Sequence, residues 1–358
     1  MTLPSPQLAL SILYISYPLL EISEASAGGA EQMLLALERE MARAEHRTTV
    51  AACDGSKIAG TLLPTGKAVS AADAFEVRER EHTKRVLAYL QAHADEFDLI
   101  HDESGSFFRH ADRCSIPMLA TLHLPRSFYQ HGWLCHPAPN LSFNCVSHSQ
   151  AQSFGDLPNM IGVVHNGIAV ERFPFCRDKQ NYLLWMGRIC EEKAPHLAIA
   201  AARKAGAPMI IAGQVYPFSY HQQYFEREVR SRIGGGVEFE DSPSFQRKVE
   251  LLKNARALLL TSTAEETSSL VAMEAMACGT PVIAIRRGAF PEIVAHGETG
   301  FVVDDIEAMA GAVGWSREID PIACRMRVER NFSARQMAGR YEGLYRRILS
   351  SHRVPIAA

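Results

Sequence analysis

Short apolar runs bounded by turn residues alternate with helical patterns from one end of the 358-residue chain to the other. The run from Leu10 to Ile15 has the pattern of a buried strand, and a helical stretch follows from about Glu31 to Ala44. In that stretch Met33, Leu37 and Met41 recur at the spacing that places apolar side chains on one face of a helix. Strands that alternate with helices are typical of parallel sheets with crossover helices, so the pattern predicts an α/β fold.

The rest of the first half follows the same rule. The stretch from Arg78 to Ala92 is expected to form a helix with a charged face. Further strands are expected at Thr49 to Cys53, Asp98 to His101, Met118 to Leu122, Phe143 to Ser147 and Gly162 to His165.

A second and more regular cycle of strands and helices starts after Phe175. Its strands are expected at Tyr182 to Met186, Met209 to Ala212, Val237 to Phe239, Ala257 to Leu260 and Val282 to Ile285. Its helices are expected at Pro195 to Ala205, Tyr220 to Ile233, Ser244 to Ala255 and Ser269 to Cys278, with short elements to about Gly314.

The length of the chain exceeds what one hydrophobic core organises, since single cores stop growing at roughly 250–300 residues. The turn region from Asn166 to Pro174 carries few apolar runs and separates the two cycles, so the linker is placed there. The sequence therefore predicts one domain over residues 1–170 and another over residues 171–333. A last helical pattern, Ala334 to Leu349, is able to pack on either of them.

Composition narrows the class of protein. Apolar residues make up 47% and charged residues 22% of the chain, as in packed globular domains. The net charge of −3 gives no global field for nucleic acid, so no nucleic-acid partner is expected. The apolar stretch Leu8 to Leu20 has no basic residue before it and is interrupted by Pro18, so it is not interpreted as a signal peptide.

No uninterrupted apolar run is long enough for a transmembrane helix. A cytoplasmic protein is expected, and peripheral membrane contact stays open. Eight cysteines without a C-x-x-C pair indicate reduced thiols rather than disulfides or zinc. Asp304-Asp305 is not a D-x-D site, and no metal and no cofactor are predicted.

Polar residues that directly follow strands of a parallel sheet are the first candidates for a site, because ligands bind beyond the carboxyl ends of such strands. Arg188 follows the strand that ends at Met186, and Lys193 stands before the next helix. Two fixed cations there would stabilise the charge that builds on a departing diphosphate. The alternative is a solvated loop.

Glu274 is the one charged residue of an otherwise apolar helical segment, Leu270 to Cys278. A buried carboxylate needs hydrogen-bond donors, which the hydroxyls of a ribose or an internal salt bridge would supply. Glu266 lies in the loop before that helix and would place a carboxylate near a sugar, or it is a solvated acid. The backbone around Ser268, Ser269 and Leu270 begins the helix and would face phosphates, with a serine as N-cap.

In the first half, Gly28-Gly29 precedes a helix whose free N–H groups are suited to a diphosphate, although glycines also mark simple turns. His123 and His101 each end a strand. Either could bind substrate hydroxyls, and a structural role is about as expected for each.

Taken together, these residues resemble the retaining glycosyltransferases of family 4. Gly187-Arg188-Ile189 with Lys193 is similar to the family's G-R-L-x-x-x-K stretch, and Glu266 to Glu274 is similar to its E-x7-E motif. The motif continues as Ala275-Met-Ala-Cys-Gly-Thr-Pro-Val282, which is strongly diagnostic. Further similar segments are Pro291 to Val294, Gly297 to Phe301, Gly28 to Glu31, the T-L-H that ends at His123, and His165 to Ile168.

The resemblance implies a GT-B fold, in which two Rossmann-like domains face each other across a cleft and the terminal helix, about 334–350, returns to the first. It implies a metal-independent hexosyltransferase that takes a nucleotide-sugar donor, with UDP as the expected nucleotide, and retains the anomeric configuration. By position, Arg188 and Lys193 would hold the diphosphate, Glu274 the ribose and Glu266 the transferred sugar. Gly29 would complete the phosphate site and His123 the sugar pocket. Retention in the family is usually explained by front-side attack, with the leaving phosphate helping to deprotonate the acceptor.

Three positions depart from the family pattern: Thr267-Ser268-Ser269 inside the E-x7-E motif, Ala194 where Gly is common, and Ala169 where Asp is common. The acceptor, a saccharide, lipid or small natural product with a hydroxyl group, is left open by the sequence. Its pocket is expected in loops such as Ser23 to Ala27 and Arg126 to Asn140. Rival interpretations are a nucleotide-sugar epimerase or hydrolase of the same fold, a non-catalytic two-domain ligand-binding protein and, more remotely, a dehydrogenase.

Overall fold

The computed structural model describes residues 8–24, 26, 28–69 and 75–352. The chain divides into two compact units, which are described in turn. Unit 1 consists of Met1–Val146, Gln150–Asn166 and Ala334–Ala358, and unit 2 of Ser147–Ser149 and Gly167–Ser333. Ala25 and Ala27, in one of the loops expected to shape an acceptor pocket, lie outside the described residues.

Unit 1 is built on a seven-stranded, fully parallel sheet in the order β3-β2-β1-β4-β5-β6-β7. The first strand therefore lies inside the sheet, and the chain moves first to one side of it and then to the other, as in Rossmann folds. The strands are β1 (Ser11–Ile15), β2 (Arg47–Ala52), β3 (Thr61–Pro64), β4 (Leu99–Asp102), β5 (Met118–Leu122), β6 (Leu141–Cys145) and β7 (Met160–Val163).

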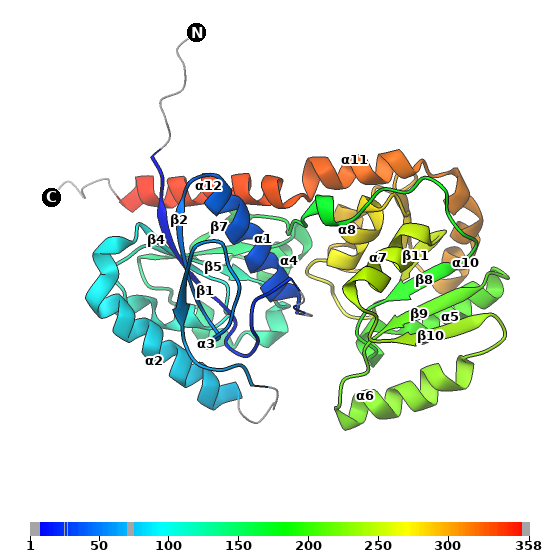
Figure 1. Ribbon diagram of the computed structural model, residues 1–358, viewed down its shortest axis with the longest axis horizontal. Helices are drawn as coiled ribbons and strands as arrows, with labels where there is room; N and C mark the ends of the chain where they lie inside the picture. Colours follow the sequence, from blue (N-terminus) through cyan, green and yellow to red (C-terminus); the bar gives the residue numbers. More distant parts are fainter. Residues whose placement is uncertain (1–7, 25, 27, 70–74, 353–358) are drawn as a thin grey trace, which may run out of the picture. The chain divides into compact units, whose positions relative to one another are not determined.

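The helices of unit 1 cover this sheet, and its central strands are buried along their whole length. The terminal helix α12 packs beside α1, as the red and blue ribbons of Figure 1 show. Its Tyr345 is buried and shares a hydrogen bond of 3.3 Å with Tyr14 of β1. The helices carrying residues of unit 1 are α1 (Gly29–Arg43), α2 (Phe75–His93), α3 (His131–Leu134), α4 (His148–Phe154) and α12 (Ala334–His352).

Unit 2 repeats the plan with a six-stranded parallel sheet in the order β10-β9-β8-β11-β12-β13. Numbered within the unit this order is 3-2-1-4-5-6, the Rossmann order, with the switch of direction between β8 and β11. The strands are β8 (Leu183–Met186), β9 (Met209–Gly213), β10 (Val237–Asp241), β11 (Ala257–Leu260), β12 (Val282–Ile285) and β13 (Gly300–Val303). The helices are α5 (Pro195–Lys204), α6 (Ser219–Tyr224), α7 (Phe245–Asn254), α8 (Leu270–Ala277), α9 (Phe290–Ile293), α10 (Ile306–Trp315) and α11 (Pro321–Asn331).

Some elements differ from the sequence prediction. Strand β3 is not foreseen, because it is a half-exposed edge strand that ends in a proline and has little apolar signal. The single helix predicted from Tyr220 to Ile233 is instead α6 followed by a π-turn at Phe225–Val229 and a 3₁₀ turn at Arg230–Arg232. Helix α10 is longer than the short elements expected up to about Gly314, and α11 lies in a stretch for which no element was predicted; each has an aspartate as N-cap.

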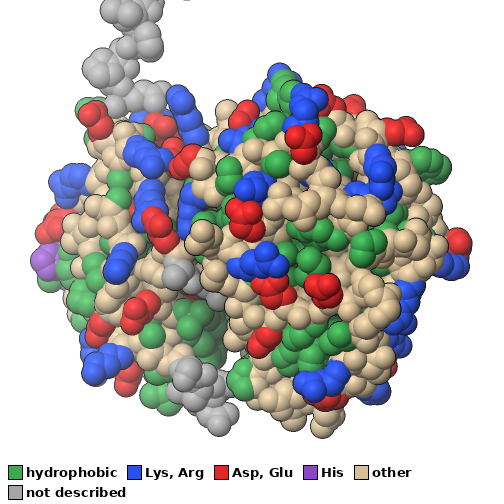
Figure 2. All heavy atoms as spheres, turned by 45° about the vertical axis from the view of Figure 1, so that its right-hand side comes forward, with side chains coloured by type: hydrophobic (Ala, Val, Ile, Leu, Met, Phe, Trp, Pro, Cys, Tyr) green, Lys and Arg blue, Asp and Glu red, His purple; other side chains and the backbone are tan. Residues whose placement is uncertain are grey.

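On the face shown in Figure 2, lysines and arginines intermingle with aspartates and glutamates. Like the net charge of −3, this mixture builds no extended field of one sign on that face. Among the described residues, none of the helices combines the length and apolar character that crossing a bilayer requires.

Candidate functional site

The switch point of unit 2 lies beyond the carboxyl ends of β8 and β11, which are neighbours in the sheet. The loop after β8 carries Arg188 and Lys193, and the loop after β11 carries Glu266 and leads into α8. The fold therefore brings the two candidate segments of the sequence to one edge of one sheet.

The two loops are joined by side chains and by backbone. Lys193 Nζ lies 2.5 Å from Glu266 Oε1, and the Ser262 hydroxyl donates a hydrogen bond to the same carboxylate. The Thr263 N–H donates to the Glu192 carbonyl at 2.9 Å. The two residues expected to contact the diphosphate and the sugar are thus each other's partners.

Arg188 lies at the same edge of the sheet, in the loop after β8. Its guanidinium donates to Glu192 Oε1 at 2.7 Å and stands 5.9 Å from the centroid of the Tyr216 ring. The side chain is 40% exposed, and that of Lys193 is 33% exposed. Both cations are therefore paired with a glutamate and still reach solvent.

Glu274 lies in α8 and its side chain is only 3% exposed. Lys248 of α7 places its Nζ 2.6 Å from Glu274 Oε1, so the internal salt bridge that the sequence left open exists. The other oxygen, Oε2, is buried and has no hydrogen-bond partner among residues 8–24, 26, 28–69 and 75–352. An unpaired buried carboxylate oxygen costs free energy unless a ligand supplies a donor.

The segment that begins α8 has a second atom of this kind. Ser269 is the N-cap, and its hydroxyl accepts from the Ala272 N–H at 3.4 Å, while Leu270 is the first helical residue. The hydroxyl of Ser268 is buried, and the described chain offers it no hydrogen-bond partner. The residue before the N-cap of α8 and the middle of the helix thus each hold a buried oxygen that has no hydrogen-bond partner in the described protein.

A neighbouring turn fixes the Glu266 loop. Ala289 donates its N–H to the Glu266 carbonyl at 2.7 Å. Gly288 has φ +49°, and a Cβ there would lie 2.2 Å from the Glu266 carbonyl oxygen. Only glycine permits this approach, so the backbone of Glu266 is held from the side of β12.

In unit 1 the carboxyl ends of β4 and β5 bring Glu103 between two histidines. Glu103 Oε1 lies 2.8 Å from His101 Nε2, and Oε2 is hydrogen-bonded to His123 Nε2. Burial opposes the charge on Glu103, but His101 and His123 outweigh it and hold the pKa of this carboxyl well below its usual range. Burial likewise opposes protonation of His123, yet the charge and hydrogen bond of Glu103 raise its pKa. His123 is therefore held towards its charged form.

His101 has a structural role. It is fully buried, and its ring nitrogens lie 2.7 Å from the Tyr345 hydroxyl and 2.7 Å from the Thr121 hydroxyl. The sequence left open whether this histidine binds substrate. Its position inside the sheet, bonded to α12, excludes that role.

Gly28 and Gly29 form the start of α1, as N-cap and first helical residue. The Glu31 carboxylate folds back over Gly28, so that a Cβ on this glycine would lie 1.9 Å from Glu31 Oε2. Burial raises the pKa of Glu31. Any phosphate at this helix end would therefore meet a carboxyl group that already faces it.

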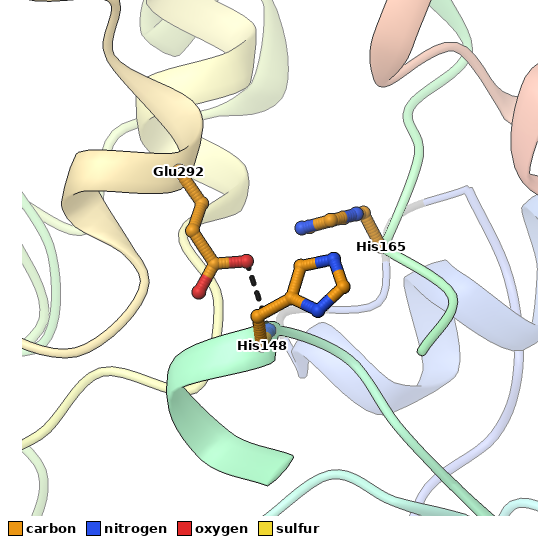
Figure 3. Close-up of side chains that lie close together, drawn as sticks. All are labelled: His148, His165 and Glu292. Atoms are coloured by element: carbon orange, nitrogen blue, oxygen red, sulfur yellow. Dashed lines mark hydrogen bonds between the residues drawn. The ribbon is translucent and has the colours of Figure 1, made fainter. Parts of the chain in front are cut away.

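Glu292, from a segment similar to the family pattern, has a structural contact. Its carboxylate accepts the backbone N–H of His148 at 2.9 Å and of Ser149 at 2.7 Å. Figure 3 shows the first of these bonds at the start of α4. Glu292 thus binds two backbone N–H groups of the segment Ser147–Ser149, which belongs to the same unit.

A comparison with models of known protein families finds a match within unit 2. A family model described as "Glycosyl transferases group 1" matches residues 170–316. Residues 170–316 are a glycosyl transferases group 1 domain. The prediction of a glycosyltransferase is confirmed at the level of this group 1 domain, which contains Arg188, Lys193, Glu266 and Glu274.

The matches to named relatives are longer than the group 1 domain. The chain is 28% identical over 250 residues to the D-inositol 3-phosphate glycosyltransferase of Mycolicibacterium smegmatis, covering 59% of this chain and 57% of that protein. It is 29% identical over 241 residues to the glycogen synthase of Mycobacterium tuberculosis, with the same two shares. The matches thus span little more than half the length of these two relatives.

Solved structures match almost the whole chain. Sucrose-phosphate synthase from Thermosynechococcus elongatus has a TM-score of 0.78 at 20% identity and covers 96% of this chain and 100% of its own. Anabaena HepE in complex with UDP and glucose has a TM-score of 0.69 at 16% identity and covers 94% and 99%. These neighbours are GT-B proteins, so the predicted GT-B fold of two Rossmann-like domains is confirmed, with the group 1 domain as the second.

Some residues around the candidate sites are not foreseen by the sequence. They are Lys248 beside Glu274, Ser262 beside Glu266, Glu192 beside Arg188, and Glu103 beside His123. Glu103 directly follows a strand, which is a usable signal. Lys248 is one of several charged residues of α7, and nothing in the sequence distinguishes it.

Proposed function

We propose that this chain is a retaining, metal-independent hexosyltransferase that moves a sugar from a nucleotide-sugar donor, a UDP-sugar, to a hydroxyl group of an acceptor. The observation that carries the proposal is a pair of buried oxygens without a hydrogen-bond partner among the described residues: Glu274 Oε2 in α8 and Ser268 Oγ, in the residue before the N-cap of that helix. Both belong to the group 1 domain, and both require hydrogen bonds that a donor nucleotide supplies.

The ribose is the partner proposed for Glu274. Lys248 holds Oε1 and thereby orients the carboxylate, so that Oε2 accepts a hydrogen bond from a ribose hydroxyl. A bond to an ionised carboxylate contributes about 1.5–3 kcal/mol. The lysine also offsets the cost of burying the charge, which a lone carboxylate in this apolar helix would carry.

The diphosphate is assigned to Arg188 and Lys193, with the backbone of Ser268, Ser269 and Leu270 at the start of α8. In the structure each cation is paired with a glutamate, Glu192 or Glu266, and both are partly exposed. A diphosphate carries more charge than a carboxylate and offers more acceptor oxygens, so it competes for both cations. As the sugar–phosphate bond breaks, the leaving diphosphate gains charge, and these cations stabilise it without a metal ion.

The same exchange gives Glu266 a role. Once Lys193 turns to the diphosphate, Glu266 Oε1 keeps the Ser262 hydroxyl and can accept a second hydrogen bond, from a hydroxyl of the transferred sugar, in place of the lysine. The Glu266 backbone stays fixed by Ala289. This rearrangement links binding of the diphosphate to binding of the sugar.

Residues of unit 1 are proposed to bind the acceptor and one side of the transferred sugar. His123, held towards its charged form by Glu103, is proposed to donate a hydrogen bond to a sugar hydroxyl. Gly28 and Gly29 are proposed to approach the diphosphate, which requires the Glu31 carboxyl to turn away or stay protonated. Retention is explained by front-side attack, in which the leaving phosphate accepts the proton of the acceptor hydroxyl, the O–H bond breaks and the new glycosidic bond forms on the same face.

UDP is proposed because Anabaena HepE, a structural neighbour, was solved with UDP and glucose. The acceptor belongs to one of three classes: saccharide, lipid or small natural product. The D-inositol 3-phosphate relative makes a polyol phosphate a sensible first compound to test.

The test is a product assay on the full chain. UDP-, GDP- and ADP-sugars are supplied with and without pooled acceptors, and products are identified by mass spectrometry. Acceptor-dependent glycoside and free UDP are expected, and both should fall in Lys193→Ala but not in Lys253→Ala, a lysine of α7 with an equivalent ion pair to Glu250 at 2.9 Å. Free nucleotide or an epimerised donor without acceptor would establish the hydrolase or epimerase alternative. Binding without any turnover would establish a ligand-binding protein.

A further inference from the structure

Three side chains of unit 2 that are able to bind a metal ion lie close together, and one of them is the partner of Arg188. Cys190 follows β8, Glu192 lies in the 3₁₀ turn Glu191–Lys193, and His221 lies in α6. One ligand atom from each, the thiol sulfur, a carboxylate oxygen and an imidazole nitrogen, lies within 4.8 Å of the other two. Thiolate, carboxylate and imidazole are the ligands that zinc takes in proteins.

The His221 ring is buried, and one of its two nitrogens lacks a hydrogen bond within the described residues. The residue is 1% exposed, and its Nδ1 atom has no hydrogen-bond partner anywhere in the described chain. Aromatic rings surround it, with the centroid of Tyr220 at 4.3 Å and that of Phe218 at 5.5 Å. Burial and the charge of Arg188 lower the pKa of His221, which favours the neutral imidazole that binds metals.

Cys190 is completely buried, its thiol donates a long hydrogen bond of 3.5 Å to the Arg188 carbonyl, and the Glu192 carboxylate is a second hydrogen-bond partner. A metal ion bound here would replace these hydrogen bonds of the thiol. Burial raises the pKa of Cys190, so binding of a metal must release a proton from the thiol.

Glu192 links this cluster to Arg188. The guanidinium binds Oε1 at 2.7 Å, and a carboxylate has a second oxygen to give to a metal. Carboxylate ligands are commonly held in this way by an outer hydrogen bond, which orients them and tunes the metal. In a tetrahedral zinc site the ligand atoms lie about 3.3–3.6 Å apart, so a contraction of at most about 1.5 Å completes the site.

We propose that Cys190, Glu192 and His221 bind a zinc ion through three protein ligands, with water at the fourth position. Arg188 is the outer residue that orients Glu192. Arg188 is also the residue assigned to the diphosphate, but the three zinc ligands are not, and zinc binding requires neither a sugar donor nor sugar transfer. The zinc proposal is therefore tested independently of the proposed function.

The experiment uses the full chain, freed of metal by a chelator and then dialysed. Zinc affinity is measured by competition with a chromophoric chelator, and cobalt(II) serves as a spectroscopic probe. We expect one equivalent of zinc and a thiolate-to-cobalt charge-transfer band. In Cys190→Ser that band should vanish, and in Cys190→Ser and His221→Gln zinc affinity should fall about tenfold or more.

Cys324→Ser is the matched control. Cys324 is also buried in unit 2, and its thiol likewise donates to a backbone carbonyl at 3.5 Å. This variant should bind zinc as the wild type does. Glu192→Gln, which changes a half-exposed turn, provides a third ligand variant that does not disturb the core.

Two results would overturn the proposal: the absence of a thiolate-to-cobalt band in the wild type, or equal zinc affinity in Cys190→Ser and Cys324→Ser. A pH series supplies a further criterion, since zinc affinity must fall as the pH is lowered if a proton leaves the thiol. Affinity independent of pH would contradict thiolate ligation.

Discussion

Lys193 Nζ lies 2.5 Å from Glu266 Oε1, which joins the loop after β8 to the loop after β11 at the switch point of unit 2. The two residues are 73 positions apart in the sequence. Because of this ion pair, each of the two charges already has a partner in the absence of substrate. In the proposed reaction the lysine exchanges a carboxylate for a diphosphate, and the glutamate is released towards the sugar.

Arg188→Ala and Lys193→Ala are expected to lower kcat by roughly 10²-fold while weakening donor binding much less, because charge on the diphosphate grows in the transition state. Steady-state kinetics and donor titrations on the same preparations measure both quantities. Lys253→Ala serves as control. Equal losses in kcat and in binding would mean that the cations contribute only to ground-state binding.

Turnover is expected to persist in excess chelator and to change less than about twofold on addition of magnesium or manganese, because the two cations supply the charge that a metal would provide. The assay compares initial rates with and without each ion. Loss of activity that magnesium or manganese restores would refute metal independence. Restoration by zinc alone would instead assign the effect to the Cys190 cluster.

Unit 1 should show a pH-dependent stability that originates at His123. Glu103 raises the pKa of His123, so the ion pair stabilises the fold fully below the unfolded value of about 6.5, and this contribution is lost as the pH rises through the folded pKa. Urea unfolding of wild type and His123→Gln from about pH 5 to about pH 9 gives the difference in free energy of unfolding. This difference between the two proteins should shrink with rising pH, by about 1.4 kcal/mol for each unit by which folding raises the pKa of His123. A difference that grows with pH would show that the sign is wrong.

Gly288→Ala should destabilise the chain and displace the Glu266 loop, since the new Cβ would lie 2.2 Å from the Glu266 carbonyl oxygen. Gly297→Ala is the matched control, because Gly297 also has a positive φ, +81°, but has nothing within 4 Å of a Cβ. The control should lose about 1–2 kcal/mol from its backbone alone. Thermal unfolding that ranks Gly297→Ala as the more damaging change would contradict the close approach.

The two Rossmann-like domains were predictable because buried parallel strands leave continuous apolar runs, and β8, β11 and β12 all do so. The placement of Arg188 and Glu274 was predictable for a related reason, since one directly follows a strand and the other is the only charge in an apolar helix. Their partners were not. Lys248 and Glu274 are 26 positions apart, and only the packing of α7 on α8 brings them together.

His101 shows the other limit. Its place at the end of a strand is the same as that of His123, yet Tyr345 of the terminal helix covers the first, while the second stays partly exposed. Whether a histidine faces solvent depended on a helix 244 residues away, which no local pattern contains. The edge strand β3 was missed for want of signal, because an edge strand needs no continuous apolar run.

The most direct test of the donor site is titration calorimetry of UDP and 2′-deoxy-UDP with wild type, Glu274→Gln and the control Glu250→Gln, whose carboxylate forms an exposed ion pair with Lys253. If Glu274 Oε2 accepts a ribose hydroxyl, the Glu274→Gln protein should stay folded and lose about 1.5–3 kcal/mol of UDP affinity. The loss should be smaller for 2′-deoxy-UDP, and Glu250→Gln should bind both as the wild type does. Unchanged UDP affinity in folded Glu274→Gln would mean that this carboxylate serves only Lys248, and would contradict the donor site.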